Sequence, residues 1–232
     1  MFWVFGMPLD FNILGQGIYS PRQAARLVGG TPQEVLRWTR GSGANDPLWH
    51  AYYQTLDDTT ELSFSDLIEL RVVKSFRRAG ISLQAIRFAI EFASGKYGVE
   101  RPLSTMRFKT DGREILHEAL ERDGEMVSLS KSRAGQKVFT EIVKQSLNDL
   151  EYEGELAARW RPAFARHVIL DPKRQFGSPL IDGFGISTAM LYEEFQEFEN
   201  VKYLAKIYEM PVALVTDAVR FEERLNKMGE DG

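Results

Sequence analysis

Four polar side chains recur on one side of a short predicted helix near the front of the chain. Residues 32–40 form this helix, and its outer face would carry Gln33, Glu34, Arg37 and Arg40. Arginine and glutamine are the side chains that pair with the edges of guanine and adenine in the major groove of DNA. The pattern predicts a helix that reads DNA, and the alternative interpretation is a solvated polar face of an ordinary helix pair.

The residues before and within this helix have the spacing of a helix–turn–helix unit. Such a unit needs a small residue where its helices cross, a left-handed turn residue four positions later, and an apolar residue about ten positions after the first. Ala25, Gly29 and Val35 meet these conditions, and glycine adopts a positive φ without steric cost. The remaining predicted DNA contacts flank this unit or follow it: Ser20, Arg22, Gln23, Thr31, Arg71 and Lys74.

A basic stripe follows on the next long amphipathic segment. The apolar period over residues 63–79 predicts a helix, and Arg71, Lys74 and Arg78 lie on one side of it. The stripe favours phosphate contacts beside the recognition helix. A solvated face is the alternative for three charges.

The middle of the chain changes its period from helical to alternating. Residues 106–110 alternate, an Asp-Gly pair that is typical of a tight turn follows, and residues 114–116 could return as a second strand. Residues 125–130 and 136–139 could add two more strands, and residues 140–150 a short helix. The sequence therefore predicts a small antiparallel sheet of three or four strands within a mainly helical α+β fold.

The last third predicts a strand and three helices. The strand covers residues 167–170, and the helices cover residues 187–199, 201–210 and 212–227. Ala205 and Val215 repeat the spacing of the first unit, with Glu209 at the turn position. The predicted outer face of the last helix carries two acids, which would repel phosphate. We interpret this unit as a packing module for a partner protein or a second copy of the chain, with DNA binding as the alternative.

Composition excludes several classes of protein. The chain has 232 residues, a net charge of −4 and no cysteine, which excludes disulfides, thiol nucleophiles and cysteine-based zinc sites. Its histidines, His50, His117 and His167, lack the spacing of a metal site. Since no catalytic or phosphate-binding motif is present either, we expect no enzyme activity, cofactor or metal. We also expect a cytoplasmic protein without a membrane segment, and a metal-dependent hydrolase is a remaining alternative.

Residues 17–97 resemble the DNA-binding domain of the MerR regulators. The resemblance is carried by residues 19–25, by Val35-Leu36-Arg37-Trp38-Thr39-Arg40-Gly41, and by residues 62–70 with 80–87. Where that family has its Gly-Tyr-Arg-x-Tyr wing, this sequence has Trp49-His50-Ala51-Tyr52.

The C-terminal part resembles a small domain of unknown function that is found in many bacterial antitoxins. The resemblance rests on residues 167–172, on residues 176–181, and on the predicted helix pair within 203–225. The combination is similar to the larger VapB-type antitoxins. It implies an apolar N-terminal arm (1–16), a MerR-like domain (17–97), a β-rich middle segment with a helix (98–160) and a C-terminal antitoxin domain of three helices (161–232).

The resemblance also implies a function. A VapB-type antitoxin would neutralise a PIN-domain ribonuclease toxin and, as a homodimer, repress its own operator on double-stranded DNA. Arg220, Arg224 and Phe221 on the last predicted helix would then contact the toxin. The alternative function is a one-component MerR-like transcription regulator whose middle domain binds a ligand.

Overall fold

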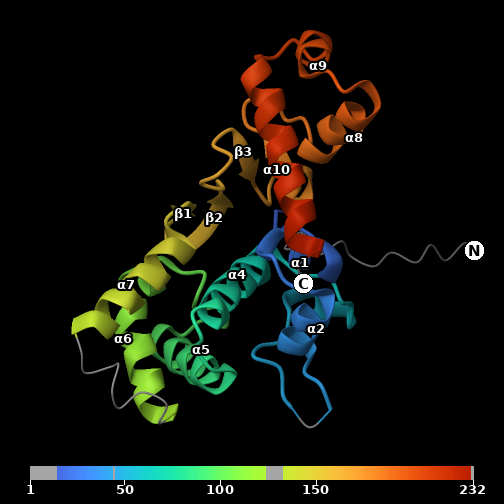
Figure 1. Ribbon diagram of the computed structural model, residues 1–232. Coiled ribbons are helices and arrows are strands. Elements are labelled where there is room, and N and C mark those ends of the chain that lie inside the picture. The colour runs from blue at the N-terminus through green and yellow to red at the C-terminus, as the bar shows by residue number, and fades with distance from the viewer. Residues whose placement is uncertain (1–14, 44, 124–132, 231–232) are drawn as a thin grey trace, which may run out of the picture.

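The protein, seen here in a computed structural model, is described over residues 15–43, 45–123 and 133–230. Its described helices up to residue 147 gather towards one end, those within residues 188–207 lie at the other, and a small sheet and the last described helix lie between the two ends (Figure 1). The fold is α+β and mainly helical, as the sequence predicts.

The helices follow one another through most of the chain. They are α1 (Pro21–Val28), α2 (Pro32–Arg40), α3 (Tyr52–Asp57), α4 (Phe64–Arg78), α5 (Leu83–Tyr97), α6 (Met106–Asp123), α7 (Arg133–Leu147), α8 (Thr188–Phe198), α9 (Val201–Ile207) and α10 (Val212–Glu230). The strands are β1 (Leu150–Glu153), β2 (Leu156–Trp160), β3 (Val168–Leu170) and β4 (Pro179–Ile181).

Reciprocal capping boxes fix the starts of the N-terminal helices. The Ser20 hydroxyl accepts the Gln23 N–H, and the Gln23 side chain accepts the Ser20 N–H; Thr31 and Glu34 do the same at α2. Each box satisfies two backbone donors that a helix start would leave unpaired. The polar residues at these starts therefore set where α1 and α2 begin.

The turn between α1 and α2 has the predicted geometry. Gly29 has a φ of 69° and a ψ of 51°, and the Gly30 N–H donates to the Ala25 carbonyl at 2.9 Å. Ala25 and Val35 are both buried. The α9–α10 turn repeats this arrangement, because Glu209 has a φ of 49° and the Met210 N–H donates to the Ala205 carbonyl at 3.0 Å.

The predicted strands at residues 106–110 and 114–116 are wrong, because both lie in α6. The buried side chains of this helix recur at helical spacing: Phe108, Ile115, Leu116, Ala119 and Leu120. Gly112 is part of the helix and not of a turn, and a Cβ there would lie 2.9 Å from the Phe108 ring. Of the other two predicted strands, residues 136–139 lie in α7, and residues 125–130 fall outside the described residues.

The sheet lies later in the chain than predicted. Its order is β1-β2-β3-β4, and all neighbours are antiparallel. Leu150 pairs with Trp160, a bulge in β2 lies opposite the step from Glu151 to Tyr152, and Val168 pairs with Ile181. The predicted strand at residues 167–170 is confirmed as β3.

Helix α10 connects the two ends of the molecule. It packs against α8, α9, β3 and α1, and Figure 1 shows it running from the α8–α9 end down to α1. At the α1 end, the Arg26 guanidinium lies 2.6 Å from the Glu222 carboxylate. The members of the buried apolar cluster range in the sequence from Tyr19, just before α1, to Leu225 in α10. Residues of α1 and α10 therefore belong to the same core.

Candidate nucleic-acid and partner interfaces

The outer face of α2 is the exposed polar surface of the α1–α2 pair. Gln33 and Arg37 are exposed there, and Arg22 is exposed at the start of α1. None of these three side chains makes a hydrogen bond or ion pair with another residue in the described parts of the chain. Their donors are therefore free for an external acceptor.

Glu34 and Lys74, both predicted DNA contacts, bind each other. Lys74 Nζ lies 2.7 Å from Glu34 Oε2 and ties α4 to α2. Burial alone would raise the pKa of Glu34, but the hydrogen bonds from Lys74 and the Thr31 N–H outweigh it and lower this pKa. This pair and the Thr31 cap hold α2 in place, while Ser20 and Gln23 cap the start of α1.

Arg40, at the end of α2, holds the segment that follows. Its guanidinium lies 2.6 Å from the Asp58 carboxylate and donates to the Thr59 carbonyl at 2.8 Å. These contacts fasten the end of α3 beside α2. Arg40 therefore supports the exposed face and borders it.

Arg71 does not belong to an exposed basic stripe. Its side chain is only 13% exposed, lies 2.6 Å from the Asp149 carboxylate, and covers the Trp160 ring at 4.6 Å from the centroid. Burial lowers the pKa of Arg71, and Asp149 offsets only part of this effect. Arg78 in turn donates to the Gly29 carbonyl at 2.9 Å. The three cations of the predicted stripe each face a different internal partner, and we leave Arg71 out of the DNA surface.

The three predicted toxin contacts on α10 lie in different surroundings. Arg220 is exposed. Arg224 lies over the Phe164 ring, 4.1 Å from its centroid. The Phe221 side chain is 0% exposed, and its ring stacks on the Phe164 ring with the two centroids 5.6 Å apart. Phe221 is therefore a core residue, and the expectation that it contacts a partner is corrected.

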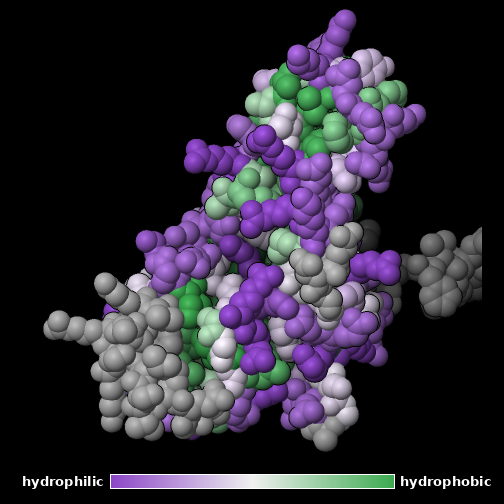
Figure 2. Space-filling model, in the orientation of Figure 1, coloured by the Kyte–Doolittle hydropathy of each residue, from purple (hydrophilic) through white to green (hydrophobic). Residues whose placement is uncertain are grey.

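An apolar patch, defined by Phe198, Tyr203 and Ile207, lies on α8 and α9 and was missed by the sequence reasoning. All three side chains are exposed, and the Phe198 and Tyr203 rings lie 5.2 Å apart. Figure 2 shows apolar side chains gathered at the end of the molecule where α8, α9 and α10 lie. Tyr203 and Ile207 are four residues apart on one helix face, which is the signal that could have predicted this patch.

No group of three or more His, Asp or Glu side chains could hold a metal ion within the described ranges. His167 lies 2.6 Å from the Asp217 carboxylate and joins β3 to α10. No helix within these ranges combines the length and the apolar character needed to cross a bilayer.

No known protein-family model matches the chain. Over 138 residues the chain is 35% identical to a Mycobacterium tuberculosis protein with the printed name "Putative antitoxin VapB45". This similarity is to a protein named as an antitoxin. The alignment takes in 55% of this chain and 57% of that protein, so the chain spans little more than half the length of the curated relative.

The fold has a counterpart among solved structures. The crystal structure of Rv2018 from Mycobacterium tuberculosis superimposes with a TM-score of 0.68, over 87% of this chain and 96% of that one. The two sequences are 24% identical. At this identity the likeness shows a shared fold and nothing about shared activity.

Proposed function

We propose that this chain is the antitoxin of a toxin–antitoxin pair, which binds a PIN-domain ribonuclease toxin and the operator DNA of its own promoter. The single observation that carries the antitoxin assignment is the 35% identity with the protein named "Putative antitoxin VapB45". Two separate surfaces of the structure support the two binding activities.

The α2 surface supports DNA binding. Arg37 and Gln33 are exposed on one helix, and Arg22 is exposed beside it. In a major groove, an arginine pairs with guanine and a glutamine with adenine, while a flanking arginine contacts phosphate. The capping boxes and the contact between Glu34 and Lys74 hold this helix in place, so the readers project from a fixed backbone.

A homodimer would place two α2 helices in successive major grooves. Their separation would be roughly 34 Å, one turn of the duplex. Because a two-fold axis relates the copies, the operator should be approximately palindromic.

The apolar patch supports toxin binding. Aromatic and large aliphatic side chains are enriched in protein interfaces, and Phe198, Tyr203 and Ile207 are exposed together. Exposed acids lie on α8 and directly after it, at Glu193, Glu197 and Glu199, and they favour a partner surface with basic residues at its rim.

Arg220 is exposed on the neighbouring helix α10 and makes no ion pair with another residue of the described ranges. A PIN-domain nuclease needs clustered carboxylates for its metal, and a guanidinium pairs with carboxylates in a bidentate manner. We therefore place Arg220 at the edge of the toxin interface, where it would neutralise that acidic site.

Co-expression with the PIN-domain reading frame beside its gene tests the antitoxin assignment. The tagged chain should retain the toxin on an affinity column and inhibit its ribonuclease activity. An Ile207→Asp substitution should weaken the complex by about tenfold or more, because it places a charge in the apolar patch.

Leu56→Asp is the matched control. Leu56 is 48% exposed on α3, and Ile207 is 49% exposed on α9, so the two variants add the same charge to equally exposed positions. The control should bind toxin like the wild type. Failure to retain the toxin would contradict the antitoxin assignment, and equal binding by both variants would move the interface elsewhere.

A further inference from the structure

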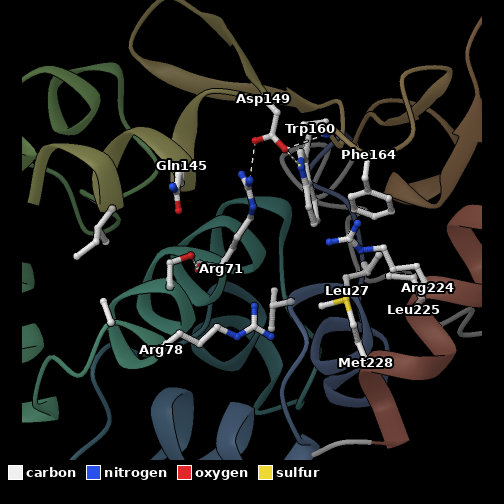
Figure 3. Close-up of a pocket in the computed structure, with 15 residues that line it drawn as sticks. Leu27, Arg71, Arg78, Gln145, Asp149, Trp160, Phe164, Arg224, Leu225 and Met228 are labelled. Atoms are coloured by element: carbon white, nitrogen blue, oxygen red, sulfur yellow. Dashed lines mark hydrogen bonds and ion pairs between the residues drawn. The ribbon is translucent and has the colours of Figure 1, made fainter. Parts of the chain in front are cut away.

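A cavity of about 580 Å³ opens where α1, α4, α7, the region around β2, and α10 meet. Figure 3 shows it with the side chains of all these elements around it. Its apolar wall includes Leu27, Ile142, Leu225 and Met228. The volume lies within the range of 300–1,000 Å³ that is typical of small-molecule sites.

The cavity has an excess of positive charge. Arg71, Arg78 and Arg224 line it, and Asp149 is the one acidic side chain among its described lining residues. The Asp149 oxygens are already occupied, since one accepts from Arg71 at 2.6 Å and the other from the indole N–H of Trp160 at 2.9 Å. Asp149 therefore cannot neutralise the other two arginines.

The guanidinium groups keep unused donors. Arg224 lies over the Phe164 ring and makes no ion pair with a described residue, and Arg78 makes one hydrogen bond, to the Gly29 carbonyl. The Nη1 of Arg71 is enclosed and has no acceptor in the described structure. Because a guanidinium has five N–H donors, Arg78 and Arg224 have the capacity to bind an anion.

We propose that this cavity binds a small organic phosphate, with Arg78 and Arg224 as the ligands of the phosphate group and the apolar wall as the site of its organic part. Two guanidiniums from different helices suit an anion with several oxygens, because each can take a separate pair of them. Arg71 also lines the cavity, with its charge paired with Asp149. The proposal goes beyond the antitoxin function and does not depend on it.

The site borders the turn that positions the predicted DNA-reading helix. Gly29 lies so close that a Cβ on it would clash with Arg78 Nη2 and with Met228 Cε. A phosphate that draws the Arg78 guanidinium into the cavity through its unused donors would strain the hydrogen bond from Arg78 to the Gly29 carbonyl. Occupancy of the cavity would therefore alter the α1–α2 turn.

Titration calorimetry with phenyl phosphate tests the proposal, because this probe combines a phosphate with an apolar ring. Inorganic phosphate and phenol are titrated separately, because the first carries only the phosphate and the second only the apolar ring. We expect saturable binding of one phenyl phosphate per chain, with clearly weaker binding of either arm. Equal affinity for inorganic phosphate would overturn the organic-phosphate assignment in favour of a simple anion site.

Substitutions of the lining arginines test whether phenyl phosphate binds in this cavity. Arg78→Gln and Arg224→Gln should each weaken phenyl phosphate binding by about tenfold, the effect of losing a charge-assisted hydrogen bond. Both residues are exposed, so the variants should fold. Arg166→Gln removes an exposed arginine outside the lining and should bind like the wild type.

Hydrogen exchange supplies a readout at the turn. Saturating phenyl phosphate should change the exchange of amides in residues 28–32 in the wild type and not in Arg78→Gln. No saturable binding, or wild-type affinity in both arginine variants, would overturn the proposal.

Discussion

The contribution of Glu69 to the free energy of unfolding should fall as the pH rises. This α4 side chain is 1% exposed, and its Oε1 accepts the Ser104 N–H at 2.8 Å. Burial raises its pKa to about 8; the Ser104 hydrogen bond and Arg101 act in the opposite direction, and Asp66 adds to the increase. In the unfolded chain the pKa returns to its ordinary value of about 4.3.

The sign of the effect follows from these two pKa values. Between them the folded state holds a proton that the unfolded state has lost, so the free energy of unfolding falls with increasing pH. Each pH unit is equivalent to about 1.4 kcal/mol. From pH 6 to pH 8 the loss attributable to Glu69 should be about 2–3 kcal/mol, and it should level off above the folded pKa.

Urea unfolding followed by tryptophan fluorescence at pH 6, 7 and 8 measures this loss. A Glu69→Gln variant keeps the shape and the acceptor for Ser104 but has no proton to release. The variant should lack this decline of about 2–3 kcal/mol in the free energy of unfolding. Subtracting its pH profile from that of the wild type removes the contribution of the histidines. Parallel pH profiles for variant and wild type would refute the reasoning.

Two further substitutions test how the helices are held. Gly29→Ala should destabilise the protein by about 2 kcal/mol, because alanine is strained at a left-handed φ and its Cβ would displace the Arg78 hydrogen bond. Gly80→Ala is the control, since Gly80 has a φ of 84° but open space around it, and it should cost only about 1 kcal/mol. Equal losses of the free energy of unfolding in urea would show that the Gly29 turn is not packed as described. Glu222→Ala should cost about 2 kcal/mol, because it removes the carboxylate that binds α1 and leaves the buried Thr188 hydroxyl only the more distant Pro179 carbonyl, at 3.4 Å, as acceptor. Glu223→Ala, on the exposed side, should stay within about 0.5 kcal/mol. Equal thermal stability of these two variants would contradict the described contact between α1 and α10.

Local signals in the sequence predicted the parts of the fold that depend on local chemistry. Ala25, Gly29 and Val35 identified the α1–α2 turn because a small crossing residue, a left-handed glycine and a buried apolar residue are each local requirements. Pro211 and the apolar period likewise predicted the last helices to within a few residues of α9 and α10.

The middle segment was mispredicted because its local signals conflict. Residues 106–110 alternate and an Asp-Gly pair follows, which favours a hairpin. Over the longer span, Phe108, Ile115 and Leu116 recur with the helical period and are buried on one face. The packing of that face against α5 and α7 prevailed over the short alternation, as tertiary context often does.

The candidate site was predicted only where side chains have no distant partner. Gln33 and Arg37 are exposed, as expected. Arg71 instead binds Asp149, a residue 78 positions away, and Phe221 is covered by the fold. Sequence spacing carries no information on such pairings, so a basic stripe on one helix could not be distinguished from three internal contacts.

Fluorescence anisotropy with a labelled duplex of the upstream promoter tests the claim that the outer face of α2 reads DNA. At fixed salt, Arg37→Ala should weaken binding by about 1–3 kcal/mol, roughly 5- to 150-fold, if it contacts a base edge. Arg166→Ala, which removes an exposed arginine far from α2 in the sequence, should change the affinity much less. Equal affinities for wild type and Arg37→Ala, or no binding to this duplex at all, would contradict the claim.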